Sequence, residues 1–330
     1  MKASVNTKYG PPEVLEIKEV EKPTPKDNEV LIKIHATTVN RTDCGFRKPE
    51  YLIVRFFSGF FKPKRKILGN ELAGEIEAIG KDVTTFKPGD PVFGLSTSKF
   101  GTHAEYICIA EKGSITTKPV NMSYREAAAV CDGLMLAKNL TRKIDFKNSP
   151  KILINGATGS IGSACVQLAK HYGAKITAVC NTRNLELVKS LGADEVIDYT
   201  KEDFTKTGQL YDVILDAVGK SSFFRCKKLL NPGGIYFSTE LGYLSQNLYL
   251  ALLTPIFGGK KVKFPIPTDC KEDIIFFKEL IETGKYKAVI DRTYRLEEIV
   301  EATIYVETGE KTGNVVIILE HNNKQPTAIV

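Results

Sequence analysis

Residues 151–162, KILINGATGSIG, are the stretch that decides the fold. An apolar run, Ile152 to Ile154, stops at Asn155-Gly156, and a glycine-rich turn of the form A-x-G-x-x-G follows. Glycine at position 159 lets the backbone approach a pyrophosphate closely, and glycine at 162 lets the following helix pack on the strand. The free N–H groups at the start of that helix would face the phosphates. The alternative interpretation is a glycine-rich turn in an ordinary α/β domain.

The segments that follow the turn favour the dinucleotide-binding interpretation. Apolar residues recur at helical spacing from Ser160, and Gly173 provides a stop. A strand is expected next at 175–180, and strands and helices then alternate, which predicts a doubly wound parallel sheet of the Rossmann type. The further strands are expected near 195–199, 211–216, 234–239 and 260–265, and the helices at 160–172, 184–191 and 221–230. The cofactor-binding residues that the turn supplies are Thr158, Gly159, Ser160, Ile161 and Gly162.

The composition is that of a globular α/β chain. The 330 residues are 42% hydrophobic and 26% charged, which is long and apolar enough for two domains. No run of about 18 apolar residues occurs, and the N-terminus lacks an apolar signal core, so we expect a cytoplasmic protein. The seven cysteines are scattered without a C-x-x-C motif, which predicts reduced thiols. The net charge of +7 is spread along the chain, so nucleic acid is not an expected partner.

The residues on either side of the nucleotide unit have a different pattern. Residues 1–118 contain several short alternating strands separated by Gly/Pro turns, which predicts a small barrel or rolled sheet. A helix is predicted over 124–142, where Ser123 and Glu126 can form a capping box. Towards the C-terminus, helices are predicted over 271–283 and 296–307, and a strand over 314–319.

Residues 51–66, YLIVRFFSGFFKPKRK, differ from their surroundings because five aromatic residues are followed by a cluster of basic ones. One interpretation is a mobile flap, apolar on its inner side, over a hydrophobic substrate. A second is a peripheral membrane or partner contact, in which apolar and basic groups act together. A third is a buried segment followed by a solvated basic loop.

Five segments, together with the glycine-rich turn, carry a resemblance to a known family. They are Asn40–Asp43 (NRTD), Gly69–Gly74 (GNELAG), Lys87–Val92 (KPGDPV), Asn184–Asp194 (NLELVKSLGAD) and Thr312–Val316 (TGNVV). In this order and spacing the chain resembles the medium-chain dehydrogenase/reductase superfamily, in its zinc-free, zeta-crystallin-like quinone oxidoreductase branch. The resemblance implies a discontinuous GroES-like β-barrel catalytic domain, residues 1–121 and 266–330, with a Rossmann domain, residues 122–265, inserted into it. It also implies a ligand cleft between the domains.

The same resemblance bears on metal binding. Zinc-dependent relatives carry a cysteine where Asn40 stands and a histidine where Asn70 stands. Asparagine is a poor zinc ligand beside thiolate and imidazole, and Cys131, near the third ligand position, cannot build the site alone. We therefore expect no zinc. Glu71 remains, and we expect its role to be structural.

Chemistry without zinc favours an activated substrate. An isolated alcohol has no Lewis acid to help it lose its proton. A conjugated enone or a quinone needs less help, because hydride addition gives a delocalised oxyanion that a few hydrogen-bond donors stabilise. The sequence therefore predicts hydride transfer from a nicotinamide cofactor to a small hydrophobic quinone or α,β-unsaturated carbonyl.

The end of the second nucleotide-binding strand favours NADPH over NADH. Selectivity for NAD usually needs an acid about 20 residues past the glycines, and residues 180–184, CNTRN, contain none. Arg183 could pair with a 2′-phosphate, and Asn181 and Thr182 could donate hydrogen bonds to it. By resemblance, Tyr199 places a phenol near the same phosphate.

The resemblance also implies the catalytic and remaining cofactor-binding residues. Asn40 and Asp43 would lie near the nicotinamide, with Asn40 donating to substrate oxygen and Asp43 orienting neighbours such as Arg47. Further cofactor contacts are implied at Ala217, Val218, Gly219, Leu241 and Asn314. Two hydroxyls usual in the family are missing: Gly45 stands in place of a tyrosine, and Met135 or Leu136 in place of a threonine.

These departures keep two other functions open. One is a nicotinamide-binding redox sensor or partner protein with little turnover, and the other is a zinc-independent alcohol or ketone reductase. The family often pairs edge strands into a homodimer. Residues 260–264, KKVKF, could be that edge, although their lysines could equally block pairing.

Overall fold

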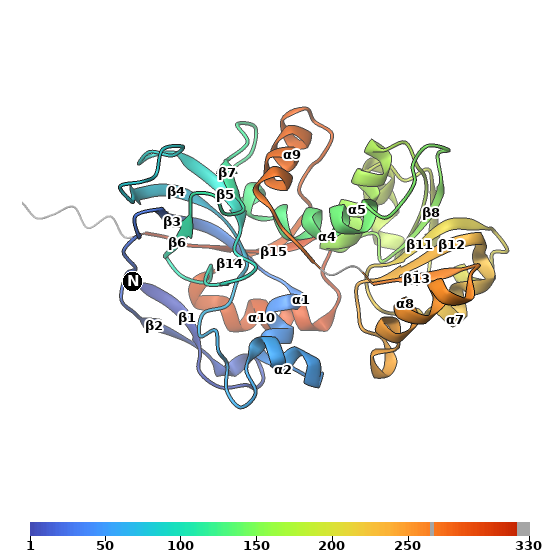
Figure 1. Cartoon of the computed structure of the whole chain (residues 1–330), viewed down its shortest axis with the longest axis horizontal. Helices are drawn as coiled ribbons and strands as arrows, with labels where there is room; N and C mark the ends of the chain where they lie inside the picture. The colour runs from blue at the N-terminus through green and yellow to red at the C-terminus, as the bar shows by residue number, and fades with distance from the viewer. Residues whose placement is uncertain (265–266, 322–330) are drawn as a thin grey trace, which may run out of the picture. The chain divides into compact units, whose positions relative to one another are not determined.

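The computed structural model describes residues 1–264 and 267–321 (Figure 1). It divides into two compact units. The first comprises Met1–Cys131, Cys270–Lys278 and Ile290–Val330, and the second comprises Asp132–Asp269 and Glu279–Val289. Both ends of the chain therefore belong to the first unit, and the second is an insertion in the sequence. The domain boundaries at 121/122 and 265/266 stay a prediction.

The second unit contains a six-stranded parallel sheet, as the sequence predicts. Its order is β10-β9-β8-β11-β12-β13. The strands are β8 (Lys151–Asn155), β9 (Lys175–Cys180), β10 (Glu195–Asp198), β11 (Tyr211–Asp216), β12 (Leu230–Ser238) and β13 (Lys261–Lys263). Residues 152–155 of β8 are all buried, which is typical of a parallel strand covered on both faces.

The order of this sheet fixes where a ligand is expected. From β8 the chain adds β9 and β10 on one side, and it later adds β11, β12 and β13 on the other. The order thus reverses between β8 and β11, and open α/β sheets bind ligands at the carboxyl ends of the strands at such a point. The helices of this unit are α4 (Cys131–Thr141), α5 (Ser160–His171), α6 (Leu185–Ser190), α7 (Phe223–Cys226) and α8 (Gln246–Phe257).

Two helix predictions differ from the structure, and one helix was not predicted. The helix expected over 124–142 is two helices, α3 (Tyr124–Ala128) and α4, because Ala129 has left helical geometry and its carbonyl accepts a hydrogen bond from Asn314 Nδ2 at 2.8 Å. The helix expected over 221–230 is short, because a 3₁₀ turn at Lys227–Leu229 follows α7. Helix α8 was not predicted, since it is apolar nearly all round and lacks a clear helical periodicity.

The first unit contains a seven-stranded, mostly antiparallel sheet organised around β3 (Glu29–Val39). This strand pairs with β4, β6 and β15, so it joins the N-terminal and C-terminal parts of the chain. The other strands of the sheet are β4 (Glu71–Ile79), β5 (Pro91–Leu95), β6 (Tyr106–Ala110), β7 (Ile115–Thr117), β14 (Ile290–Arg295) and β15 (Asn314–Ile318). A separate hairpin consists of β1 (Lys2–Asn6) and β2 (Leu15–Glu19).

Short helices complete the described part of the chain. They are α1 (Arg41–Arg47), α2 (Leu52–Ser58), α9 (Lys271–Glu282) and α10 (Ile299–Thr308), with 3₁₀ turns at Pro12–Val14, Thr182–Asn184, Phe204–Lys206, Tyr243–Ser245 and Leu296–Glu298. Among the described residues, none of the helices has the length and apolar character needed to cross a bilayer. All seven cysteines are free thiols. Burial raises the pKa of Cys44 to about 12 and that of Cys226 to about 11, so these thiols are poor nucleophiles at neutral pH.

Glu111 allows a test of the fold of the first unit by pH. Its carboxylate accepts hydrogen bonds from the backbone N–H groups of Thr85 and Thr84, at 2.5 and 2.6 Å, and from the Thr85 hydroxyl at 2.8 Å. These bonds lower the pKa of Glu111 from 4.5 to about 2. The unfolded chain therefore binds this proton more readily, and the stabilisation is complete above pH 4.5 and is lost as the pH falls towards 2.

We expect Glu111→Gln to lower the free energy of unfolding at pH 7, and the deficit relative to wild type to shrink as the pH falls from 4.5 towards 2. Urea unfolding at a series of pH values measures this. Glu202→Gln, at an exposed position, is the matched control and should show no such convergence. A deficit that does not depend on pH would contradict the assignment.

Candidate active site

A buried hydrogen-bond network lies at the carboxyl edge of the parallel sheet, where β8 and β11 end. Asn155 Nδ2 donates to Asp216 Oδ1 at 3.0 Å. Asp216 is fully buried, and its Oδ2 also accepts from the Ser221 backbone N–H at 2.9 Å and from the Tyr236 hydroxyl at 3.2 Å. Burial and the neighbouring carboxylate raise the pKa of Tyr236, which therefore remains a donor. Asp216 was not predicted from the sequence, although an acidic residue at the end of an apolar strand is a recognisable sign of a functional position at the edge of the sheet.

The glycine-rich turn has the geometry of an anion site. A Cβ placed at Gly162 would overlap the carbonyl oxygen of Gly156, so the fold itself requires glycine there. A Cβ at Gly159 would come no closer than 3.8 Å to its nearest neighbour, so packing within the chain does not require this glycine. Gly159 is the N-cap of α5 and provides no side-chain cap. Because no side chain caps α5, the N–H groups of its first turn are left to bind phosphate oxygens, and there is room for a ligand beside Gly159.

Two loops converge on this turn. Val218 packs so closely on Gly156 that a Cβ there would overlap its side chain, and a Cβ at Gly219 would overlap Glu240. The Ala217 N–H donates to the carbonyl of Asn155 at 3.0 Å. The second loop is fixed by Asn247, whose Nδ2 donates to the Glu240 carbonyl at 2.8 Å and whose N–H donates to the Leu241 carbonyl at 3.0 Å. The structure thus brings together residues 156–162, 217–219 and 240–242 at one edge of the sheet.

The corner after β9 is organised by Asp198, which sequence reasoning missed. Its carboxylate accepts from the Thr182 hydroxyl at 2.6 Å and from the hydroxyl and backbone N–H of Thr200 at 2.7 and 3.0 Å. Lys201 forms an ion pair with it at 3.6 Å. These hydrogen bonds lower the pKa of Asp198 to about 2. The Thr182 hydroxyl therefore donates its one hydrogen to Asp198, and towards a ligand it can act only as a hydrogen-bond acceptor.

The other predicted residues of this corner differ in whether their side chains already have hydrogen-bond partners. The Asn181 side-chain oxygen accepts from Asn184 Nδ2 at 2.8 Å, so its own amide N–H groups point elsewhere. Arg183 is exposed and has no hydrogen bond or ion pair within the described residues. Tyr199 is also exposed. Arg183 and Tyr199 are therefore available to a ligand, and their role in binding one stays a prediction.

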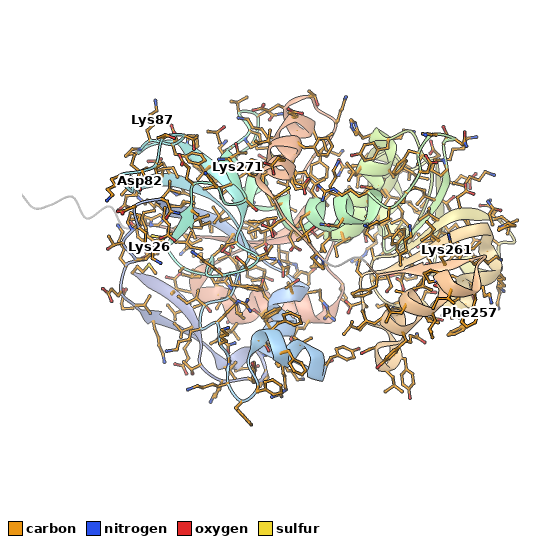
Figure 2. The ribbon with its side chains drawn as sticks, in the orientation of Figure 1. Lys26, Asp82, Lys87, Phe257, Lys261 and Lys271 are labelled. Carbon is orange, nitrogen blue, oxygen red and sulfur yellow. The ribbon has the colours of Figure 1, made fainter. Side chains whose placement is uncertain are left out.

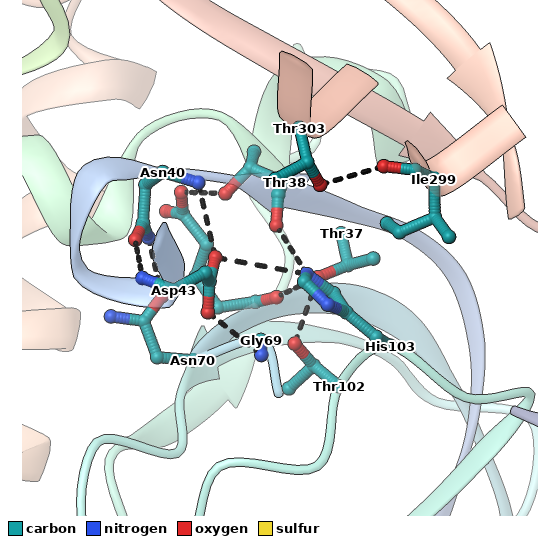
Figure 3. Close-up of polar contacts among 11 residues, drawn as sticks. Thr37, Thr38, Asn40, Asp43, Gly69, Asn70, Thr102, His103, Ile299 and Thr303 are labelled. Carbon is teal, nitrogen blue, oxygen red and sulfur yellow. Dashed lines mark hydrogen bonds and ion pairs between the residues drawn. The ribbon is translucent and has the colours of Figure 1, made fainter. Parts of the chain in front are cut away.

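The first unit holds a second polar cluster, shown in Figure 3, at the start of α1. Asn40 caps this helix: its Oδ1 accepts from the Asp43 N–H at 3.1 Å, and Asp43 Oδ2 accepts from the Asn40 N–H at 3.0 Å. Asn40 Nδ2 donates to Asn70 Oδ1 at 2.7 Å. This bond uses one of the two hydrogens of the Asn40 amide, and neither side chain offers the thiolate or imidazole that zinc prefers.

Asp43 is a positioning residue in this cluster, but not for the neighbour that we expected. Its Oδ1 accepts from the Gly69 N–H at 2.8 Å, and its Oδ2 lies 3.7 Å from Nε2 of the buried His103. Burial raises the pKa of Asp43. The expectation that Asp43 orients Arg47 is wrong, because the Arg47 guanidinium contacts the Gly10 carbonyl and Glu307 instead.

His103 was not predicted, because no motif marks it in the sequence. Its Nε2 lies 2.8 Å from the carbonyl of Thr38, so Nε2 carries the proton and donates. Its buried Nδ1 has no hydrogen-bond partner within the described part of the chain. Thr38 also donates its hydroxyl to the buried carboxylate of Glu71, which agrees with the structural role expected for Glu71. The cluster thus ties β3, α1 and β4 together.

The remaining predicted residues can be placed individually. Asn314 is buried at the start of β15, and its amide nitrogen donates to the carbonyl of Ala129. Met135 is buried, and Leu136, the next residue of α4, is half-buried. Leu136 is therefore the more accessible of the two residues at the position where the family usually has a threonine.

Two family models match the chain. The model described as "Alcohol dehydrogenase GroES-like domain" matches residues 26–120, and the one described as "Zinc-binding dehydrogenase" matches residues 191–317. The chain is also 35% identical over 329 residues to the 2-methylene-furan-3-one reductase of Solanum lycopersicum, covering 96% of this chain and 79% of the relative. The chain belongs to the medium-chain dehydrogenase/reductase superfamily, in its quinone oxidoreductase branch.

Other members of the superfamily agree with this assignment. The NADPH-dependent alkenal/one oxidoreductase of Arabidopsis thaliana is 32% identical, over 96% of this chain and 79% of its own. Among solved structures, the quinone oxidoreductase from Coxiella burnetii superposes with a TM-score of 0.86 at 25% identity, covering 97% of this chain and 99% of that one. The predicted Rossmann and GroES-like fold is therefore confirmed.

The two glycines of the turn should respond differently to the same substitution. We expect Gly162→Ala to lower the free energy of unfolding by at least about 2 kcal/mol, because its Cβ has no room. Gly159→Ala should cost less than about 1 kcal/mol, since only the preference of the N-cap for glycine is lost. It should nevertheless weaken NADPH binding about tenfold, because the methyl group points to the space beside the helix N-terminus. Urea unfolding and a fluorescence titration measure the two effects, and equal destabilisation by both changes would contradict the distinction.

Proposed function

We propose that this protein is an NADPH-dependent oxidoreductase that reduces quinones or enones without zinc. The observation that carries the proposal is the Asn40–Asn70 amide pair, which occupies the positions of two zinc ligands in metal-dependent relatives. Without a Lewis acid, the favoured substrates are those whose reduced oxyanion is delocalised. The names of several relatives, such as the alkenal/one oxidoreductase and the quinone oxidoreductase homolog of Arabidopsis thaliana, describe the same chemistry.

The second unit provides the residues that would hold the cofactor. NADPH, when bound, supplies the hydride. The pyrophosphate would lie at the N-terminus of α5 beside Gly159, and the loops 217–219 and 240–242 would support the nicotinamide end. Arg183 would pair with the 2′-phosphate. Asp198 would not accept the ribose diol of NADH, because three hydrogen bonds and Lys201 already use its carboxylate.

The first unit provides the residues proposed to act on the substrate. Asn40 Nδ2 carries two hydrogens, and the bond to Asn70 uses one of them. The second can donate to the substrate oxygen as negative charge develops there. Asp43 holds Asn40 in place through the reciprocal helix cap, so Asp43 is a positioning residue. Solvent can supply the final proton to the enolate or quinol.

Location and assembly stay proposals as well. The cytoplasmic location expected from the sequence is one proposal; some relatives carry "chloroplastic" or "mitochondrial" in their printed names. A homodimer is the other. The strand β13 ends the parallel sheet and pairs only with β12 among the described strands, so it leaves an edge that a second copy could extend.

Arg183 decides the cofactor preference in this proposal. We expect Arg183→Ala to weaken NADPH binding by about 10- to 100-fold, the effect of losing one charge-assisted pair. Binding of NADH should change by less than about twofold, since NADH lacks the 2′-phosphate. Lys189→Ala, which removes another exposed cation from the same unit, is the control. An equal loss for both cofactors would show that Arg183 does not contact the 2′-phosphate.

Metal independence and substrate class can be tested together. We expect turnover of an alkenal and of 9,10-phenanthrenequinone with NADPH to survive dialysis against 1,10-phenanthroline, because the proposed donors are amides. The reduced alkenal should be the saturated aldehyde and not the allylic alcohol. Loss of turnover that zinc restores would contradict the proposal, and the allylic alcohol as product would favour the alternative carbonyl reductase. Saturable NADPH binding without turnover would favour the redox sensor.

A further inference from the structure

Residues 55–66, which we name the aromatic-basic loop, expose an unusual amount of apolar surface. Phe56 and Phe57 are 66% and 64% exposed, Phe60 is 47% exposed, and Phe61 is 96% exposed. The interpretation of this stretch as a buried apolar segment is therefore wrong for these four side chains. Contiguous exposed apolar groups of this kind mark interaction sites in native proteins.

The aromatic-basic loop is held in shape by hydrogen bonds within itself and to Tyr9. The Tyr9 hydroxyl bonds to the Gly59 carbonyl at 2.6 Å and to Ser58 Oγ at 3.0 Å, and the Lys64 N–H closes the loop on the Ser58 carbonyl at 2.7 Å. Arg55 donates to the Phe60 carbonyl at 2.8 Å. Phe56 and Phe57, at the end of α2, and Phe60 and Phe61, in the turn after it, thus project from a backbone that is already ordered, so binding there does not require its conformational entropy to be lost.

Arg65 anchors the aromatic-basic loop to the body of the first unit. Its guanidinium lies 5.3 Å from the ring centroid of Phe46 and 5.0 Å from that of Phe100. It donates to the Phe57 carbonyl at 3.0 Å and to the Ser98 carbonyl at 2.8 Å. Burial lowers the pKa of Arg65, but the group stays charged at neutral pH because the ordinary value is 12.5.

The charged residues of the aromatic-basic loop are all basic. Lys62, Lys64 and Lys66 are exposed and follow Phe61 in the sequence, which contains no acidic residue between Glu50 and Glu71. A neutral quinone or enone carries no negative charge that three lysines could bind. A second copy would bring the same lysines face to face, which like-charge repulsion disfavours. The exposed phenylalanines and the lysines together match a partner that has an apolar interior under a negatively charged surface. An anionic lipid bilayer has that structure.

We propose that the aromatic-basic loop docks this protein onto anionic lipid bilayers. Phe61, Phe60 and Phe56 enter the boundary between head groups and acyl chains, and the three lysines contact lipid phosphates. The ring centroid of Phe60 lies 6.5 Å from that of Phe61 and 4.9 Å from that of Phe56. The loop does not span the membrane, and the attachment is peripheral and weakened by salt. If the proposed function holds, this attachment brings the enzyme to quinones dissolved in the bilayer, but docking itself does not depend on catalysis.

Helix α8 carries another exposed apolar face, which serves as a contrast. Tyr249, Leu252, Ile256 and Phe257 are exposed on it, and Figure 2 labels Phe257 near Lys261 of β13. The helix contains no charged residue. Nothing in the described structure indicates what covers this face, so we assign it no occupant, and it enters the experiment as a competing site.

The test is sedimentation of the purified full chain with lipid vesicles at about 0.1 M salt. Phosphatidylcholine vesicles are compared with vesicles that contain about 30% phosphatidylserine. We expect wild type to partition at least about tenfold better onto the anionic vesicles, and Phe61→Ser and Lys64→Glu each to reduce that partition about fivefold or more. Turnover of a water-soluble alkenal should be unchanged in both variants.

Two matched variants control for general effects of hydrophobicity and charge. Phe224→Ser changes a phenylalanine of α7 that is 65% exposed, and Lys112→Glu reverses an exposed lysine outside the loop. Both should partition within about twofold of wild type. Melting temperatures of all variants show whether the fold is intact.

Three outcomes would overturn the proposal. The first is no binding of wild type to anionic vesicles. The second is that Phe61→Ser and Lys64→Glu bind anionic vesicles as well as wild type does, whereas Phe257→Ser binds them less. That result would place the membrane contact on α8. The third is a raised KM for a soluble quinone in Phe61→Ser with no change in vesicle binding, which would make the loop a substrate flap. Vesicle binding without turnover would support docking while contradicting the proposed function.

Discussion

The hydrogen bond between Asn155 and Asp216 is the interaction on which the nucleotide-binding unit depends. It joins the two central strands at the point where the order of the sheet reverses. The same carboxylate fixes the following loop through the Ser221 N–H, and that loop in turn packs on the glycine-rich turn through Val218. A buried carboxylate without such partners would cost several kcal/mol, so the network must form as a whole. The shape of the ligand edge is therefore tied to the stability of the sheet.

In the first unit, a network of hydrogen bonds satisfies the buried polar groups around the start of α1. Asn40 and Asn70 satisfy each other, Asp43 caps the helix that carries Asn40, and His103 is fixed by the carbonyl of Thr38. The cluster is almost entirely buried, where each polar group needs a partner. Rigid amide donors suit a reaction in which charge develops on one oxygen, because they need no reorganisation as that charge appears.

The sequence predicted those parts of the structure that local chemistry determines. Strand β8, the glycine-rich turn and α5 follow from apolar runs and glycines, and β9 and β11 lie where they were expected. The break at Ala129 was not predictable, because it depends on Asn314, which is distant in the chain. His103 was missed for the same reason, since its partner Thr38 lies 65 residues away on β3. Asp198 was missed although Thr200 and Lys201 are close to it in the sequence, because its contact with Thr182 depends on the pairing of β9 with β10. The exposure of Phe61 was also hidden, because an apolar run does not reveal which of its faces is packed.

The pairing of β15 with β3 has a consequence for synthesis of the chain. Along one edge of β3, residues Glu29–Lys33 pair with β6, whereas residues Ala36–Val39 pair with β15, which comes much later in the chain. At about 5–20 residues per second, that part of the edge waits roughly 15–55 s for its partner on the ribosome. The inserted unit, whose strands all lie between β8 and β13, can assemble during this interval. Until β15 is made, residues 36–39 of β3 present an unpaired strand edge, which is a site where other chains can pair.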